Sequence, residues 1–248
     1  EKYLNNFNEA HIKSSKNSAF IKTHKKVRNI NKFEKGEWWV QDFASMLPLA
    51  LIPKTKNLSI LDICAAPGGK AFQILSDNMV VLNDINIKRI SKLKTNLSRL
   101  KFNPKIMNLN GLDFDENHKF DMVILDAPCS SIGTIRKHPE IFFKSKNPDL
   151  TSLNLLQKNL LEKSSRLIKS KGKIVYMVCS FFYSETIDII KNFLEKNRNF
   201  SIEGYSPNKE FSDLKHLISK EGYFLTLPTD YKNFNIDGFF SVQLVRND

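Results

Sequence analysis

The sequence has no apolar run that approaches the roughly 20 residues needed to cross a bilayer, and its first residues lack the apolar stretch of a secretory signal. Its three cysteines, Cys64, Cys129 and Cys179, form no CxxC pair, which argues against a disulfide framework and a zinc site. We therefore expect a soluble protein of the reducing cytoplasm, without membrane contact and without a bound metal ion.

Acidic residues are also in the minority, because 38 Lys and Arg stand against 26 Asp and Glu, for a net charge of +12. Residues 1–35 contain nine Lys or Arg and three Glu, and so hold half of that net charge. A segment this basic is typical of an arm that contacts phosphates, although a solvated basic surface is the alternative. The chain opens on Glu1 rather than Met, which is compatible with a fragment of a longer protein.

Short β-rich runs alternate with amphipathic segments from about residue 57 onward. The expected strands are 58–63, 79–84, 105–109, 120–126, 173–178, 223–227 and 239–245, and the expected helices are 41–51, 70–77, 87–100, 149–170 and 184–197. Because the first five strands are continuous apolar runs, the pattern predicts a mostly parallel α/β sheet covered on both faces. The last two strands predict an antiparallel hairpin at one edge, and 198–222 is expected to be a loop with one short helix.

All three cysteines fall directly after expected strands: Cys64 after the first, Cys129 after the fourth and Cys179 after the fifth. In open parallel sheets, ligands bind beyond the carboxyl ends of the strands. Structural cysteines are expected to scatter through the core, so their collection at one edge indicates chemistry.

The stretch "LDICAAPGGKAFQIL" predicts a strand, a small-residue turn with Gly68 and Gly69, and then a helix. Such glycines allow a ligand to approach the backbone, but the spacing fits neither a P-loop nor G-x-G-x-x-G. Asp84 follows the second strand, where nucleotide-binding sheets place a carboxylate for ribose hydroxyls. A helix N-cap is the alternative role for Asp84. These features favour a nucleoside-containing cofactor.

Four motifs, "DICAAPGGK", "DAPCSSIGTIRKHPEI", "VCS" and "DGFFSVQL", resemble those of the Sun-type RNA cytosine-5 methyltransferases, and most of all the bacterial 16S ribosomal-RNA enzymes of the Fmu/Sun type. The resemblance covers the chain from about residue 38 to its C-terminus. It implies a Rossmann-like class I methyltransferase fold with a seven-stranded sheet over residues 41–248. Residues 1–40 would form a short basic region that contacts RNA. The expected molecule is a cytoplasmic monomer.

The resemblance implies S-adenosylmethionine as the cofactor. Asp84 would hold its ribose, Asp113 would lie near its adenine, and Asp126 would lie near the reacting centre. Asp115 competes with Asp113 for the adenine contact. The loop around the methionine and ribose portion would consist of Cys64, Ala65, Ala66, Pro67, Gly68, Gly69 and Lys70.

The resemblance also assigns the catalytic groups. Addition of a thiolate at carbon 6 of cytosine makes carbon 5 nucleophilic toward a methyl sulfonium. Cys179 would be this nucleophile, Cys129 would assist product release, and Asp126 would contact the ring, where a hydrogen bond stabilises developing charge. The family usually has Thr before the nucleophile, where this chain has Val178.

Other residues keep two interpretations. Cys64 is expected to be a small apolar filler, with any cofactor contact made through its backbone. Lys70 would either neutralise a carboxylate near the cofactor or cap a surface. Arg136, Lys137 and His138 would contact substrate phosphate or ribose, or else form a solvated loop. Phe181, Phe182 and Tyr183 would stack on bases or, more in keeping with their position, fill the core beside the fifth strand.

Three alternative functions remain to be compared with methylation of 16S rRNA. A tRNA cytosine-5 methyltransferase would share every catalytic motif. A catalytically weak rRNA-binding assembly factor would not need Asp126, Cys129 and Cys179 together. An amino-methyltransferase requires an Asn/Asp-Pro-Pro-aromatic turn, and the corresponding turn here reads Asp-Ala-Pro-Cys.

Overall fold

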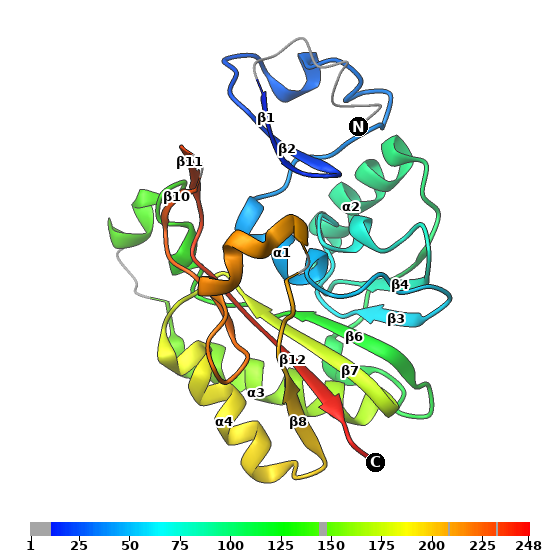
Figure 1. Ribbon diagram of the computed structural model, residues 1–248. Coiled ribbons are helices and arrows are strands. Elements are labelled where there is room, and N and C mark those ends of the chain that lie inside the picture. Colours follow the sequence, from blue (N-terminus) through cyan, green and yellow to red (C-terminus); the bar gives the residue numbers. More distant parts are fainter. Residues whose placement is uncertain (1–10, 144–147, 208, 232) are drawn as a thin grey trace.

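A central sheet of eight strands organises the chain. Figure 1 shows the computed structural model of the chain. The model describes residues 11–143, 148–207, 209–231 and 233–248. Seven strands form a continuous path, and an eighth strand pairs with one of them beside this path. In spatial order the strands are β5 (Lys105–Met107), β4 (Met79–Asn83), β3 (Ser59–Asp62), β6 (Phe120–Asp126), β7 (Ile168–Val178), β12 (Phe239–Arg246) and β8 (Phe200–Glu203), with β9 at Phe224–Thr226.

The sheet is parallel from β5 to β7 and antiparallel beyond it. Strand β12 runs antiparallel to β7, and both β8 and β9 run antiparallel to β12. The predicted mostly parallel fold with an antiparallel pair at one end is therefore confirmed. The sheet gains an eighth strand, β8, from the polar segment that was expected to be a loop. This strand escaped prediction because only Phe200 of its four residues is buried.

Helices cover both faces of the sheet. Helices α1 (Phe43–Ala50) and α2 (Ile87–Leu100) lie on one face, and α3 (Leu150–Leu167) and α4 (Ile187–Lys196) lie on the other. Side chains cap three of these helices at their first turn, where free N–H groups need acceptors. The capping residues are Asp42 for α1, Asn86 for α2 and Asp149 for α3.

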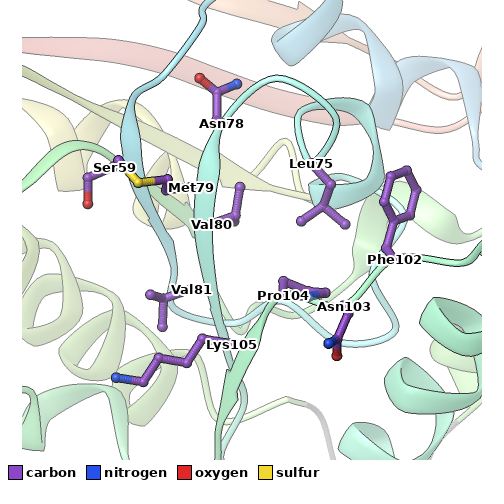
Figure 2. Close-up of a pocket in the computed structure, with 10 residues that line it drawn as sticks. All are labelled: Ser59, Leu75, Asn78, Met79, Val80, Val81, Phe102, Asn103, Pro104 and Lys105. Atoms are coloured by element: carbon purple, nitrogen blue, oxygen red, sulfur yellow. The ribbon is translucent and has the colours of Figure 1, made fainter.

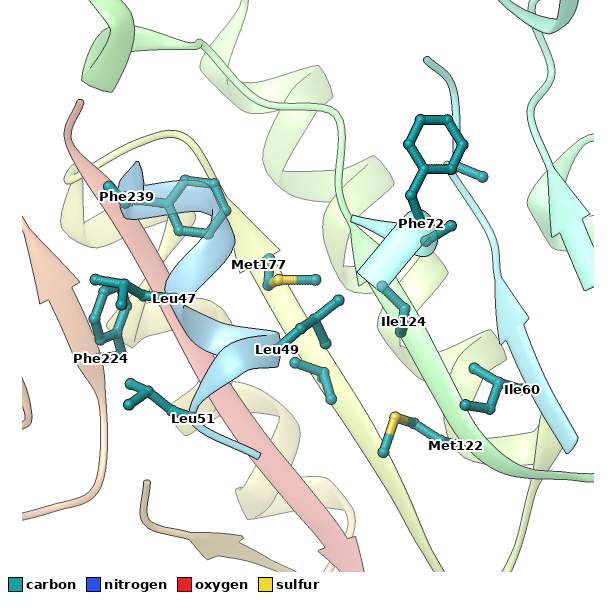
Figure 3. Packing of buried hydrophobic residues seen from close by; sticks show 14 of the residues in the cluster. Leu47, Leu49, Leu51, Ile60, Phe72, Met122, Ile124, Met177, Phe224 and Phe239 are labelled. Atoms are coloured by element: carbon teal, nitrogen blue, oxygen red, sulfur yellow. The ribbon is translucent and has the colours of Figure 1, made fainter. Parts of the chain in front are cut away.

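Alternate residues of the central strands enter two separate hydrophobic cores. On β6, Ile124 packs with the α1 and α2 side, whereas Val123 and Leu125 pack with the α3 and α4 side. Figure 3 shows the first core, with Leu47 of α1 over the strands. A sheet buried on both faces is held in a fixed register, because a slip of one residue would exchange the two faces.

Two expected helices differ from the structure. Only a 3-10 turn, Ala71–Gln73, forms in place of the helix at 70–77. The side-chain amide of Asn78 donates to the Ile74 carbonyl and so replaces the hydrogen bond that a longer helix would make. The expected helix 149–170 ends at Leu167, because β7 already begins at Ile168 and continues through Gly172.

Two small hairpins lie outside the main sheet. They are β1 (His11–Ser15) with β2 (Ser18–Ile21), and β10 (Thr229–Tyr231) with β11 (Phe234–Ile236). The Phe20 ring of the first stacks on Phe234 of the second, with centroids 4.4 Å apart. The first ten residues of the expected basic region 1–40 lie outside the described residues, and the boundary at residue 40 stays a prediction.

The remaining elements are 3-10 turns. They are η2 (Val27–Asn29), η3 (Ala71–Gln73), η4 (Gly111–Asp113), η5 (Ile132–Thr134), η6 (Pro139–Phe143), η7 (Tyr183–Glu185) and η8 (Lys209–Leu217). Within the described part of the chain, every helix is too short or too polar to cross a membrane.

Candidate active site

Neighbouring parallel strands bring two cysteines together at the carboxyl edge of the sheet. Asp126, the last residue of β6, lies opposite Met177 of β7. The Ala127 N–H continues this pairing by donating to the Met177 carbonyl at 2.9 Å. Cys129 and Cys179 follow in the next loops, and their sulfurs are 3.3 Å apart. The structure therefore joins two residues that are 50 positions apart in the sequence.

Gly133 allows the loops behind these cysteines to approach each other. Its N–H donates to the Cys179 carbonyl at 3.0 Å, and its own carbonyl accepts from the Gly238 N–H at 2.8 Å. A Cβ atom at position 133 would lie 2.0 Å from the Gly238 oxygen, much closer than any real contact. The backbone around Cys179 is thus fixed by a position that only glycine can occupy.

The two thiols are polarised in opposite directions. A hydrogen bond from Cys129 lowers the pKa of Cys179, although burial and the nearby Asp126 carboxylate oppose this effect. The same hydrogen bond, together with burial, raises the pKa of Cys129 well above its ordinary value. The Ser131 hydroxyl, 3.5 Å from the Cys179 sulfur, further favours the thiolate. The thiolate therefore forms more readily at Cys179 than at Cys129.

Lys70 forms an ion pair with Asp126 beside the cysteines. Its Nζ lies 2.7 Å from Asp126 Oδ2 and 5.1 Å from the centroid of the Phe239 ring. Burial works against the charge of Lys70, but the Asp126 carboxylate outweighs it and raises the pKa of the amine. Of the two interpretations of Lys70, the structure agrees with the one in which Lys70 neutralises a carboxylate, that of Asp126.

The loop of residues 64–70 is held in place by α2. Arg89 donates to the carbonyl of Ala66, and Asn96 donates to that of Pro67 at 3.1 Å. Gly68 has a positive φ of 113°, and a Cβ atom there would lie 2.2 Å from the Phe72 ring. Cys64 packs against the second core, and burial raises the pKa of its thiol, as expected of a small apolar filler.

Asp84 is buried beside this loop and does not cap α2. Its Oδ2 accepts from the Ala66 N–H at 3.3 Å and lies 3.4 Å from Arg89. Its Oδ1 accepts from the Asn86 N–H at 2.9 Å, and Asn86 itself is the N-cap of α2. The cap interpretation of Asp84 is therefore wrong, because the cap lies two residues later.

Asp113 and Asp115 differ in the hydrogen bonds that their carboxylates make within the local turn. Asp113 ends η4 and is exposed. The Asp115 carboxylate binds its own turn, through the Asn117 N–H at 2.9 Å and His118 Nδ1 at 3.2 Å. Between the two candidates for the adenine contact, Asp113 is the one that the local turn leaves available for a ligand.

Sequence patterns missed Asp62, the last residue of β3. Its Oδ1 is buried and has no hydrogen-bond partner, and burial raises the pKa of the carboxyl group to about 8. The neighbouring Asp126 carboxylate contributes to this rise, and Lys70 opposes it. An acidic residue that ends an otherwise apolar strand is the sequence signal by which this position could have been found.

The carboxyl edge of β3, β4 and β6 is thus rich in acceptors. Asp62, Asp84 and Asp126 end or directly follow these strands, and Asp62 offers an orphaned buried oxygen. S-adenosylmethionine carries a positive sulfonium, an ammonium group and two ribose hydroxyls, all of which need acceptors or negative charge. The residues present therefore fit this cofactor.

Arg136 and Lys137 are engaged in an ion cluster rather than in a free loop. Lys137 Nζ lies 2.7 Å from Asp42 and 2.6 Å from Asp237, and Arg136 lies 3.1 Å from Asp237. His138 is exposed and contacts Glu140 at 3.1 Å. Sequence reasoning considered a phosphate contact or a solvated loop, and it missed the two carboxylates because they are distant in the chain.

The residues around the nucleophile also have defined places. Val178 is buried in the second core, which explains how an apolar residue is accommodated before Cys179. Phe181 and Phe182 are half-buried and contact each other edge to face, whereas Tyr183 is 68% exposed. Only Tyr183 of these three has a largely exposed ring.

A hollow of about 410 Å³ lies at the opposite edge of the sheet. Figure 2 shows that Ser59, Met79 and Lys105, the first residues of β3, β4 and β5, line it. Ligands of parallel sheets bind at the carboxyl ends of strands, so this hollow is on the wrong edge for the chemistry described above. No cluster of metal-binding side chains occurs among the residues that the structure describes.

The hydrogen bond between the thiols makes the reactivity of Cys179 depend on Cys129. Alkylation by iodoacetamide requires the thiolate, so Cys179 should react at a lower pH than an ordinary cysteine, and before Cys129. In Cys129→Ala the pKa of Cys179 should rise, and its alkylation should shift to higher pH. Peptide mass spectrometry over a pH series measures both rates. An unchanged profile in the variant would show that the thiols do not interact.

Comparison with known proteins identifies the family. The model of the 16S rRNA methyltransferase RsmB/F family matches residues 48–245. Ribosomal RNA small subunit methyltransferase B of Photorhabdus laumondii is 35% identical over 182 residues, which are 71% of this chain and 42% of that protein. Its counterpart in Shewanella oneidensis is 29% identical over 238 residues, 94% of this chain and 53% of that protein. The chain spans about half the length of these curated relatives.

Solved structures agree on the fold. NSun6 from Pyrococcus horikoshii superimposes with a TM-score of 0.76 over 90% of this chain and 57% of its own, at 22% identity. The region that the family model matches contains the loop of residues 64–70 and the two loops that carry Cys129 and Cys179. It also contains the motif "DGFFSVQL", most of which lies in β12. The chain therefore belongs to the 16S rRNA methyltransferase RsmB/F family.

Proposed function

We propose that this chain transfers a methyl group from S-adenosylmethionine to carbon 5 of a cytosine in 16S ribosomal RNA, through a covalent bond between Cys179 and carbon 6 of the base. The observation that carries the proposal is the pair of sulfurs 3.3 Å apart, next to the ion pair of Lys70 and Asp126. Family membership supports ribosomal RNA as the substrate. The two loops that carry Cys129 and Cys179 support methyl transfer through a covalent intermediate, because they bring two thiols together.

The proposed reaction begins at Cys179. Its thiolate adds to carbon 6 of cytosine, and the ring becomes an enamine whose carbon 5 is nucleophilic. Bound S-adenosylmethionine supplies an electrophilic methyl group on a positively charged sulfur. Afterwards solvent takes the proton from carbon 5, and the electron pair left behind restores the ring double bond as the bond between carbon 6 and the Cys179 sulfur breaks. We assign to Cys129 the assistance of this release.

Asp126 has a role in charge stabilisation in this proposal. A hydrogen bond to its carboxylate from the ring nitrogen beside the amino group, once that nitrogen has taken up a proton, would stabilise the base as the thiolate adds. Lys70 holds one oxygen of this carboxylate at 2.7 Å and so fixes its orientation. Positioned groups of this kind act without reorganising during the reaction.

The cofactor would lie along the acceptor-rich edge. The backbone of residues 64–70 would surround its methionine and ribose portion, and Asp84 would accept from the ribose hydroxyls. Asp113 would lie at the adenine, and Asp62 would face the positive groups. A neighbour of the same fold, NSun6 of Pyrococcus horikoshii, was solved with the cofactor analogue sinefungin.

RNA contact is proposed for the basic N-terminal region and for the loop that carries His138. The target base must be single-stranded or flipped, because carbon 6 is covered by stacking within a duplex. Arg136 and Lys137 would approach phosphate only as part of the cluster with Asp42 and Asp237, whose two carboxylates offset their charge. The exposed ring of Tyr183 is suited to stack on a base.

The nucleophile assignment predicts a selective loss. Cys179→Ala should reduce methyl transfer to below about one thousandth of the wild-type rate, because no other group replaces the covalent step. Cofactor affinity should change little, since the loop of residues 64–70 and Asp84 are untouched. Transfer of labelled methyl to 16S rRNA transcribed in vitro measures the first effect, and calorimetric titration with S-adenosylmethionine measures the second. Substantial turnover by the variant would refute the assignment.

The release role of Cys129 predicts a trapped intermediate. Cys129→Ala should still form the bond between Cys179 and carbon 6 but should resolve it slowly, so that a protein–RNA adduct accumulates. Denaturing gels with labelled RNA detect this adduct, and Cys129→Ala combined with Cys179→Ala is the matched control without a nucleophile. If the single variant gives no band above that control, Cys129 has another function.

A further inference from the structure

Glu185 is a carboxylate with no exposed surface, and the reaction proposed above does not use it. It lies in η7, just before α4, where an acidic residue normally serves the first turn of the helix. Its side chain does not bind that helix, however. Both carboxylate oxygens accept hydrogen bonds from residues beside the paired cysteines instead.

The donors come from both cysteine loops. Oε1 accepts from the Ser130 N–H at 2.8 Å, and Oε2 accepts from the hydroxyls of Ser130 and Ser180, each at 2.6 Å. Ser130 directly follows Cys129, and Ser180 directly follows Cys179. One carboxylate thus joins the residues that come after the two sulfur-bearing positions.

The same carboxylate is anchored to the helical layer. Gln157 of α3 donates to Glu185 Oε1 at 3.1 Å and to the Pro128 carbonyl at 2.9 Å. The Tyr176 hydroxyl donates to the backbone carbonyl of Glu185 at 2.8 Å. Hydrogen bonds from α3 and β7 therefore hold Glu185 in place. Through its bonds to Ser130 and Ser180, Glu185 in turn holds both cysteine loops.

We propose that Glu185 is a positioning residue that holds the Cys129 and Cys179 loops together, so that the two sulfurs face the same bond of the substrate base. The catalytic consequence rests on the function proposed above, but the geometric claim does not. Buried charged groups make strong hydrogen bonds, and a carboxylate accepts several donors at once. An apolar residue at this place would leave the Ser130 N–H and two hydroxyls without their acceptor.

A cross-linking experiment measures the geometry directly. Dibromobimane becomes fluorescent after both of its arms have reacted with thiols, so its rate of cross-linking reports whether Cys129 and Cys179 stay within reach. Mass spectrometry of the digested protein identifies the bridge between these two positions. The variants are Ser180→Ala, which removes one of the bonds to Glu185, Glu185→Ala, which removes them all, and Glu185→Gln.

Ser164→Ala is the matched control. Ser164 is also a fully buried serine, and its hydroxyl donates to the Leu160 carbonyl within α3, away from the cysteine loops. Its removal costs stability in the same way but leaves the carboxylate network intact. Thermal unfolding of every variant shows how much stability each change removes.

The proposal predicts that Ser180→Ala slows cross-linking by about tenfold and Glu185→Ala slows it further, because each removes hydrogen bonds that join the two cysteine loops. Glu185→Gln should stay within about twofold of the wild type, since its oxygen still accepts from Ser130 N–H and its amide donates to hydroxyls that also accept. Ser164→Ala should cross-link like the wild type. If Glu185→Ala does not fold, Ser180→Ala decides the result.

Two outcomes would overturn the proposal. Cross-linking at the wild-type rate in Ser180→Ala would show that the network does not position the sulfurs. An equal loss in Ser164→Ala would show that general destabilisation explains the effect. Methyl transfer separates this result from the proposed function: Ser180→Ala should lower kcat with little change in KM. Suppose that cross-linking is slower in Ser180→Ala and that the wild-type chain transfers no methyl group. The positioning role of Glu185 would then stand, and the proposed methyltransferase function would be refuted.

Discussion

The parallel pairing of β6 with β7 is the constraint on which the site depends. Because the two strands run in the same direction and share a fixed register, their carboxyl ends deliver Asp126, Cys129 and Cys179 to one place. The hydrogen bond between the sulfurs then lowers the pKa of Cys179 and raises that of Cys129. A single loop would not bring two thiols to the same bond of a base so readily.

Side chains from both helical layers complete this arrangement. Arg89 and Asn96 of α2 hold the glycine loop on one face of the sheet. Gln157 of α3 holds the network around Glu185 on the other face. The sheet is buried on both sides between these layers, so the site inherits the rigidity of two packed cores. The two packed cores thereby fix the position of the cysteine pair relative to Asp62, Asp84 and Asp126 at the carboxyl edge of the sheet.

Much of this architecture is predictable from local sequence, and the failures have physical causes. Continuous apolar runs identified the parallel strands, and the 3.6-residue period gave α2 with its observed ends. The expected helix at 70–77 failed because the side-chain amide of the next residue, Asn78, takes the Ile74 carbonyl that a longer helix would use. Glu185 and the ion cluster of Lys137 were missed because their partners lie far away in sequence. Such polar networks become visible only when the fold brings their members together.

The central claim, that Cys179 attacks carbon 6 of the target cytosine, is tested most directly with an RNA substrate that carries fluorine at carbon 5 of this base. Fluorine cannot leave as a proton does, so methylation leaves the enzyme bound to the RNA. The account predicts an adduct that survives denaturation, forms only with S-adenosylmethionine, and maps to Cys179 by mass spectrometry of the digested protein. An adduct on Cys129, or a methylated base without any adduct, would contradict it.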